Sequence, residues 1–239
     1  MKAMIFAAGL GSRLKPWTDT HPKALAIVNG KSLLQRNIEY LQKIGITQVI
    51  VNVHHFAEQI IDAIQYNNGW GSAITISDET EDVLETGGGL KKAAWYFAGE
   101  DDFVLMNADV LTDMKLGNMI EQHKEKKALA TLATSNRSTS RYFLFNETGW
   151  LCGWENVQTG VRRIERDGYI LHQQAFSGIH IINTGLLSLI KQVGKFSMVD
   201  VYLSLVKHDN IYSFNHTGAR FIDVGKPESV IKAEALFIE

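Results

Sequence analysis

Apolar and polar positions along the first half of the chain alternate between short strand-like runs and longer helical patterns. Four apolar runs have the length of buried strands: Lys2 to Phe6, Gln48 to Asn52, Ala73 to Ser77 and Phe103 to Met106. Helical spacing predicts helices between them, over Leu33 to Lys43, Ala57 to Tyr66 and Gly88 to Phe97. Strands that alternate with helices are typical of an α/β protein with a mostly parallel, doubly wound sheet.

From about Ala128 onward the pattern becomes mainly strand-like. Turn residues at Asn146 to Gly149 and at Asp167-Gly168 predict hairpins. The candidate strands are Ala128 to Thr134, Tyr142 to Phe145, Leu151 to Glu155 and Phe176 to Ile182, and two helices around Val199 to Lys207 and Pro227 to Phe237 flank a strand pair that ends at Phe221 to Gly225. We therefore expect one domain over residues 1–239, with a mostly parallel half (1–127) and a β-rich half (128–239).

Three unusual loops fall where strands of this sheet end. They are a glycine-rich loop after Phe6, the stretch Glu85 to Gly89, and the stretch Asn107 to Val110 after Met106. In doubly wound sheets, ligands bind beyond the carboxyl ends of the strands. We expect the three loops to meet at one site.

The glycine-rich loop has the chemistry of a phosphate site. Gly9 and Gly11 allow the backbone to approach a ligand, and Arg13 and Lys23 add positive charge. The motif is not a Walker loop, and it is not a dinucleotide fingerprint either, because Leu14 stands where a third glycine is needed. A structural turn with two ordinary surface charges is the alternative interpretation.

Two aspartates follow apolar strands at positions suited to a metal ion. Asp109 comes after the run that ends at Met106, and Asp223 precedes the sequence Val-Gly-Lys-Pro. Mg²⁺ is bound by one or two carboxylates together with substrate phosphates and water. Each aspartate also has an ordinary alternative, a helix cap for Asp109 and a turn residue for Asp223.

Composition narrows the classes of function. The formal net charge is −2 and no block of like charge is present, so we expect no nucleic-acid partner. No segment approaches about 18 consecutive apolar residues, so we expect no membrane span. The single cysteine, Cys152, excludes an internal disulfide and suits a reducing compartment. With no secretory pattern at the N-terminus, the expected location is cytoplasmic.

The motifs, taken together and in order, resemble those of sugar-1-phosphate nucleotidylyltransferases. The order is the G-x-G-x-R loop, Pro22-Lys23, the glycine triplet from Gly87, Asn107-x-Asp109, Ser177-Gly178-Ile179 and Asp223-Val-Gly-x-Pro, and it covers Met1 to about Ala233. The resemblance implies a Rossmann-like fold and Mg²⁺-dependent transfer of a nucleoside monophosphate from a nucleoside triphosphate to a sugar 1-phosphate. The chain is similar to compact members that act on N-acetylmuramate, mannose or heptose 1-phosphate.

The resemblance also implies a set of site residues. Arg13 would contact the β- and γ-phosphates, Lys23 would bridge the α-phosphate and the acceptor phosphate, and Asp109 and Asp223 would bind the metal. The implied nucleotide-binding residues are Ala7, Ala8, Gly9, Gly11, Ser12, Arg13, Thr86, Gly87 and Asn107. The implied acceptor-binding residues are Lys23, Ser177, Gly178, Glu165 and Asp200.

One departure from the family pattern concerns the acceptor. Many relatives carry Glu-Lys-Pro in a strand that contacts the sugar, and this chain has no such tripeptide. The nearest stretch is Arg163 to Arg166, from which Glu165 is taken. A cytidylyltransferase for a phosphocholine-like acceptor and a catalytically silent nucleotide-sugar sensor are the alternative functions. The nucleobase, the sugar, any feedback regulation and the choice between monomer and homo-oligomer stay open.

Overall fold

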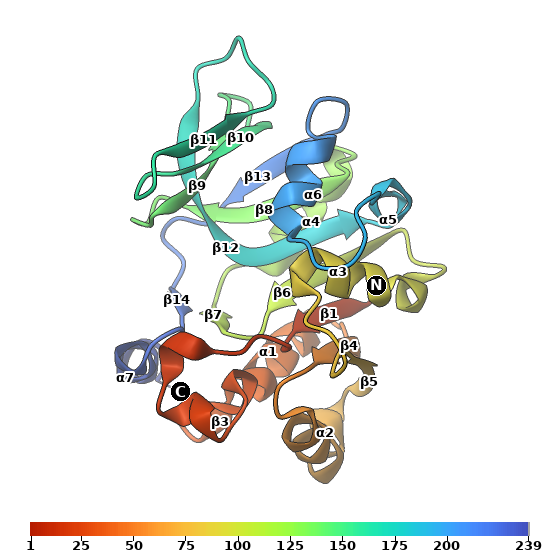
Figure 1. Cartoon of the computed structure of the whole chain (residues 1–239), viewed down its shortest axis with the longest axis vertical. Coiled ribbons are helices and arrows are strands. Elements are labelled where there is room, and N and C mark those ends of the chain that lie inside the picture. Colours follow the sequence, from red (N-terminus) through yellow and green to blue (C-terminus); the bar gives the residue numbers. More distant parts are fainter. Residues whose placement is uncertain (239) are drawn as a thin grey trace.

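A ten-stranded sheet runs through the whole protein and carries helices on its faces (Figure 1). The structure is a computed structural model that describes residues 1–238. The strands of the sheet are β1 (Ala3–Phe6), β4 (Gln48–Val53), β5 (Ala73–Asp78), β6 (Asp102–Asn107), β8 (Ala130–Ser135), β9 (Arg141–Phe145), β10 (Leu151–Asn156), β11 (Val161–Ile164), β12 (His172–Asn183) and β13 (Ile211–Asn215). The main order is β11-β10-β9-β12-β6-β1-β4-β5, and β8 joins it by pairing with β12 and β13.

The parallel part of the sheet is the part that the apolar runs predict. Strands β5, β4, β1 and β6 are parallel, and Ile5 of β1 pairs with Val51 on one side and Met106 on the other. Successive residues of a strand point to opposite faces, so Ile5 belongs to one buried cluster and Met4 to another. Because both faces are covered, the prediction of a doubly wound α/β sheet is confirmed.

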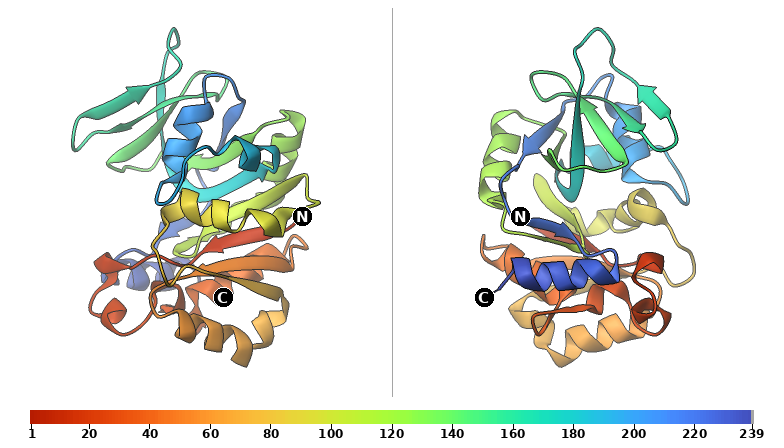
Figure 2. Two further views of the ribbon diagram at one scale, coloured as in Figure 1. Left: turned by 45° about the vertical axis from the view of Figure 1, so that its right-hand side comes forward. Right: turned by 90° about the vertical axis from the view of Figure 1, so that its left-hand side faces the viewer.

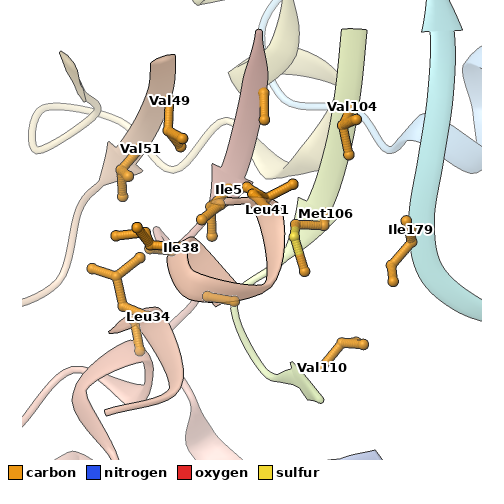
Figure 3. Close-up of a cluster of buried hydrophobic side chains, with 14 of the residues drawn as sticks. Ile5, Leu34, Ile38, Leu41, Val49, Val51, Val104, Met106, Val110 and Ile179 are labelled. Carbon is orange, nitrogen blue, oxygen red and sulfur yellow. The ribbon is translucent and has the colours of Figure 1, made fainter. Parts of the chain in front are cut away.

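Helices cover both faces of the parallel strands. The helices are α1 (Leu33–Gln42), α2 (Ala57–Tyr66), α3 (Glu85–Lys92), α4 (Leu116–Glu125), α5 (Gly185–Leu189), α6 (Met198–Leu205) and α7 (Pro227–Leu236). Figure 3 shows Ile38 and Leu41 of α1 against Val49, Val51 and Met106, in a cluster to which α2 and α4 also contribute. Apolar residues of α3 and α6 belong to the second cluster, with Met4, Ile50 and Leu105 of the strands.

The second half is antiparallel, with one exception. Strand β12 pairs antiparallel with β6, β8 and β9, β9 and β10 form a hairpin that β11 extends, and β13 is parallel to β8. The four candidate strands and the hairpin at Asn146 to Gly149 are confirmed, and β11 is a strand that the pattern did not predict. The predicted hairpin at Asp167-Gly168 is wrong, because β11 pairs with β10 whereas β12 pairs with β9. The predicted strand pair ending at Phe221 to Gly225 is wrong as a pair, because β13 pairs with β8 and β14 pairs with β7. Within residues 1–238, no helix has both the length and the apolar character that a membrane crossing requires.

Two short ladders lie outside the main sheet. One joins β2 (Ile27–Val28) to β3 (Lys31–Ser32), and the other joins β7 (Val110–Thr112) to β14 (Phe221–Asp223). The second ladder brings the C-terminal segment back to the N-terminal one. Val224 and Ala233 pack there with Leu14 and Leu33, and Figure 2 shows α7 beside the N-terminal segment.

Candidate active site

The loop after β1 presents a row of free backbone donors. Within residues 1–238, the N–H groups of residues 8–13 donate no hydrogen bond to the protein. Gly11 has φ 63°, and a Cβ there would lie 2.8 Å from Thr18 Cγ2 and 3.0 Å from Lys23 Cβ, so this position requires glycine. Gly9 does not take positive φ, but it faces open space. Unpaired N–H groups beside Arg13 and Lys23 are suited to bind phosphate oxygens.

A cavity of about 260 Å³ lies beyond the carboxyl ends of the parallel strands. It joins the three loops that the sequence singles out, as expected for a doubly wound sheet. Its lining residues are Phe6, Ala7, Ala8, Gly9, Lys23, Ala24, Asn52, Glu79, Val83, Glu85, Thr86, Asn107, Ala108 and Asp109. Five of the residues expected to bind nucleotide are therefore on its wall, namely Ala7, Ala8, Gly9, Thr86 and Asn107.

The two candidate metal-binding aspartates meet at one edge of this cavity. In the ladder of β7 and β14, Asp223 is opposite Val110, and Val224 N donates to Asp109 O at 2.8 Å. Lys23 Nζ donates to Asp109 Oδ2 and lies 3.9 Å from Asp223 Oδ1. The two carboxylates, 114 residues apart in sequence (223 − 109), thus share one ammonium group.

Arg13 reaches the same aspartate over a glycine. A Cβ on Gly225 would lie 3.0 Å from Arg13 Nη2 and 2.8 Å from Asp223 Oδ1. The guanidinium and the carboxylate therefore pack on the bare backbone of Gly225. The glycine of the Asp-Val-Gly motif has a direct steric role, because a side chain would push these two groups away.

The two carboxylates of Asp109 and Asp223 repel each other, so their site favours a bound cation. Burial raises the pKa of Asp223, and the negative charge of Asp109 raises it further, while Lys23, Arg13 and Arg137 lower it. The net shift is upward, so burial together with the charge of Asp109 outweighs the three cations. Lys23 Nζ occupies the position of a cation between two carboxylate groups, and this donor set is the one that a hard divalent ion prefers.

The glycine triplet owes its composition to the packing of α3 against the segment before α6. A Cβ on Gly87 would lie 2.4 Å from the Phe196 ring, and one on Gly88 would lie 2.4 Å from Gly194 O. The helix begins at Glu85 and not at Gly88 as the sequence pattern predicts, so the glycines lie inside it and not at its start. Thr86 lines the cavity, and its Oγ1 accepts a hydrogen bond from Met198 N at 3.0 Å.

Asn52 and Glu79 are buried cavity residues that the sequence reasoning missed. Asn52 Oδ1 accepts from Ala7 N at 2.8 Å, and Asn52 Nδ2 donates to Glu79 Oε1 at 2.8 Å. Burial raises the pKa of the Glu79 carboxyl group. The sequence does carry a signal for this position, a polar Asn52 inside the otherwise apolar run from Val49 to Val53.

The acceptor residues fall into two separate groups. Gly178 has φ 72°, and a Cβ there would lie 2.8 Å from Asn107 Nδ2, so Ser177-Gly178 lies against the cavity wall. The Ser177 hydroxyl is buried 2.7 Å from His216 Nε2. Asp200 instead accepts from Arg163 at 2.8 Å and from Ser197 at 2.8 Å. The other residue of this second group is Glu165, which lies 3.8 Å from the charged nitrogens of Arg163 and Lys207.

Among residues 1–238, which the structure describes, Glu165 and Asp200 do not line the cavity. Their ion pairs hold β11 near α6, and Ser197 gives Asp200 the hydrogen bonds of a helix start. An acceptor-binding role for these two residues stays a prediction.

Comparison with known proteins identifies relatives of the whole chain. The family model described as nucleotidyl transferase matches residues 2–152. The chain is 29% identical to a mannose-1-phosphate guanyltransferase of Yarrowia lipolytica, over all of this chain and 64% of that protein. It is 41% identical over 114 residues to an N-acetylmuramate alpha-1-phosphate uridylyltransferase of Neisseria meningitidis, which covers 48% of this chain and 49% of that protein. The chain spans 64–65% of the length of the guanyltransferases it matches.

Solved structures share the fold. A putative glucose-1-phosphate thymidylyltransferase from Bacillus anthracis superposes with a TM-score of 0.83 at 18% identity, over 99% of this chain and 94% of that chain. HddC from Yersinia pseudotuberculosis, solved in complex with GMP-PN, superposes with a TM-score of 0.77 at 24% identity, over 98% of both chains.

Proposed function

The chain belongs to the nucleotidyl transferase family, and we propose that it transfers a nucleoside monophosphate from a nucleoside triphosphate to a sugar 1-phosphate. An oxygen of the acceptor phosphate attacks the α-phosphorus, the bond from that phosphorus to the bridging oxygen of the β-phosphate breaks, and pyrophosphate leaves. The observation that carries the proposal is the shared contact of Asp109 and Asp223 with Lys23, beside the free N–H groups of residues 8–13.

The charged residues divide the work of this displacement. The N–H groups of residues 8–13 and Arg13 bind the β- and γ-phosphates, so negative charge on the departing pyrophosphate meets fixed donors. Lys23 contacts the α-phosphate and the acceptor phosphate, which holds the two reacting groups together. Both cations adjoin Asp223, so their positions are set before substrate binds.

Mg²⁺ is the cofactor that we propose for the aspartate pair. The site passes a test of fit, because Asp109 and Asp223 already surround one positive charge. No group of three or more His, Cys, Asp or Glu side chains able to hold a metal forms within residues 1–238. The remaining ligands would be phosphates and water, as Mg²⁺ prefers. When bound, Mg²⁺ neutralises the phosphate charge and polarises the reacting phosphoryl group.

For the acceptor we propose N-acetylmuramate, mannose or heptose 1-phosphate. The support is the likeness to a mannose-1-phosphate guanyltransferase and to an N-acetylmuramate alpha-1-phosphate uridylyltransferase. These two relatives are named for different bases, so the base is to be chosen by experiment. The single cysteine supports a cytoplasmic location.

The decisive experiment measures pyrophosphate release over a matrix of nucleoside triphosphates and phosphorylated acceptors with Mg²⁺. We expect turnover with at least one sugar 1-phosphate. Turnover only with phosphocholine would support the cytidylyltransferase. Nucleotide binding without turnover anywhere in the matrix would support the silent sensor.

Lys23→Ala tests the assignment of roles. We expect kcat to fall by about a hundredfold or more, because a fixed cation at the reacting phosphates stabilises the transition state, while the KM for nucleotide changes little. Lys15→Ala is the matched control, since Lys15 pairs with Asp19 at 2.8 Å on the exposed side of the same segment. A raised KM with normal kcat in Lys23→Ala would contradict the role.

A further inference from the structure

Arg137 is a charged residue beside the site that the reaction described above does not use. It follows β8 and precedes β9. Its Nη2 donates to Phe176 O at 2.6 Å, and its guanidinium lies 5.1 Å from the centre of the Phe221 ring. Phe176 is on β12 and Phe221 is on β14. One side chain therefore bridges the strand of the acceptor segment and the strand of Asp223.

Each strand is paired at the residue that Arg137 contacts, Phe176 with Thr134 and Phe221 with Thr112, but its ladder shifts or ends close by. The register of β12 against β8 shifts between Phe176 and His180, around Gly178 with its positive φ. Strand β14 has three residues and pairs with β7, outside the main sheet. Side chains therefore add to the backbone pairing here. Arg137 joins the two strands, and so does His216, whose Nε2 lies 2.7 Å from Ser177 Oγ and whose ring lies 5.6 Å from the Phe221 ring.

The bridge is not explained by stability alone. Arg137 Nε is buried without a hydrogen-bond partner among the described residues. A buried, unpaired N–H group opposes folding. A placement that leaves one donor unsatisfied, yet aims the guanidinium at two functional strands, indicates a role in the geometry of the site.

We propose that Arg137 is a positioning residue. It fixes the position of the strand of Asp223 relative to the acceptor segment Phe176-Ser177-Gly178. The inference rests on the proposed function and deepens it, because it assigns a residue that aligns the acceptor with the metal-binding aspartate. Loss of the bridge allows the two strands to shift relative to each other. A displacement of about 1 Å in a reacting group lowers turnover by about a hundredfold.

Arg137→Met tests the proposal, with Arg220→Met as its matched control. Arg220 precedes β14 and pairs with Asp113 at 2.7 Å. Like Arg137 it contacts a ring and a carbonyl group, but these belong to Phe237 (5.2 Å) and Leu236 (3.0 Å) at the end of α7 and not to β12. We expect Arg137→Met to lower kcat by about ten- to a hundredfold, with the KM for nucleotide within about twofold. Arg137→Lys should recover part of the loss, since it keeps the charge and a donor.

Amide hydrogen exchange supplies a readout that does not need activity. Arg137→Met should speed exchange in residues 177–179 and 221–224 together, whereas Arg220→Met should affect the second segment only. Equal falls in kcat and the same exchange pattern for the two variants would overturn the proposal. A wild-type protein without transfer activity would overturn the proposed function, and the exchange comparison would still decide whether Arg137 couples the strands.

Discussion

Asp109 and Asp223 contact the same lysine, yet the regions that carry them are built in different ways. Asp109 follows β6, a buried strand paired with β1 on one side and β12 on the other. Asp223 ends a three-residue strand paired with β7, and the groups around it are Arg13, Lys23 and Arg137. Long ladders position the first aspartate, whereas short pairing and a few side chains position the second.

From this difference we expect single substitutions to have larger effects around Asp223 than around Asp109. Many backbone hydrogen bonds fix the position of Asp109, so we expect that a substitution of one neighbouring residue moves it little. Around Asp223 each contact has a larger share, because the ladder is short and the neighbours come from three distant segments.

Neutral replacement of each aspartate should separate activity from stability. Asp109→Asn and Asp223→Asn should both lower kcat by about a thousandfold, because metal-assisted charge stabilisation is worth several kcal/mol. In the absence of metal, Asp223→Asn should raise Tm. The pKa of Asp223 is raised in the folded protein, so its ionised form opposes folding above that pKa, and asparagine removes this charge.

Asp109→Asn should lower Tm instead, because it removes the ion pair with Lys23. Single-turnover kinetics and metal-free thermal unfolding check both variants. A lower Tm for Asp223→Asn would show that its contacts with cations outweigh the cost of burial.

Alanine substitutions at two glycines with positive φ, Gly11 and Gly178, allow the phosphate region to be compared with the acceptor region. Gly11→Ala would place a methyl group against Lys23 Cβ, and Gly178→Ala would place one against the Asn107 amide. We expect Gly11→Ala to lower kcat about tenfold by moving Lys23, and Gly178→Ala to raise mainly the KM for the acceptor.

Gly45→Ala controls for backbone strain. Gly45 has φ 79°, and a Cβ there would have no atom within 4 Å, so alanine brings the strain, about 1–2 kcal/mol, without a contact. Denaturant unfolding should give a smaller loss of stability for Gly45→Ala than for Gly11→Ala or Gly178→Ala, because only the latter two add a close contact to the strain. If Gly45→Ala lost as much turnover as Gly11→Ala, backbone strain and not the contact with Lys23 would explain the effect of Gly11→Ala.

The smallest effect that we expect is a loss of stability at acid pH caused by a buried histidine in the second half of the protein. His180 is fully buried 2.6 Å from the Tyr202 hydroxyl, and burial lowers its pKa to about 3. The unfolded chain takes up this proton near pH 6.5 while the folded protein does not, so stability falls as pH drops below 6.5, by about 1 kcal/mol per pH unit.

Urea unfolding at pH 7.5 and 5.5 measures this loss, and His180→Gln should reduce it. Burial also lowers the pKa of His123 and His216, so part of the acid sensitivity should remain in the variant. An unchanged pH dependence in His180→Gln would mean that other groups cause it.

Much of the phosphate region could be predicted because parallel strands share one edge. Apolar runs located β1, β4, β5 and β6, and the loops after them had to meet there. Lys23 and Asp109 therefore line one cavity, and Gly11 packs against Lys23, as the sequence led us to expect.

The α/β sheet and the chemistry of the loops could be predicted because hydrophobic period and spacing are local properties, and the order of the motifs carried the resemblance to the family. The contacts of Asn52 with Glu79, the packing of the glycine triplet and the bridge made by Arg137 are visible in the folded protein alone. The same is true of the ion pairs of Glu165 and Asp200. These features depend on which side chains meet across segments far apart in the chain, and neither hydrophobic periodicity nor motif spacing encodes such meetings.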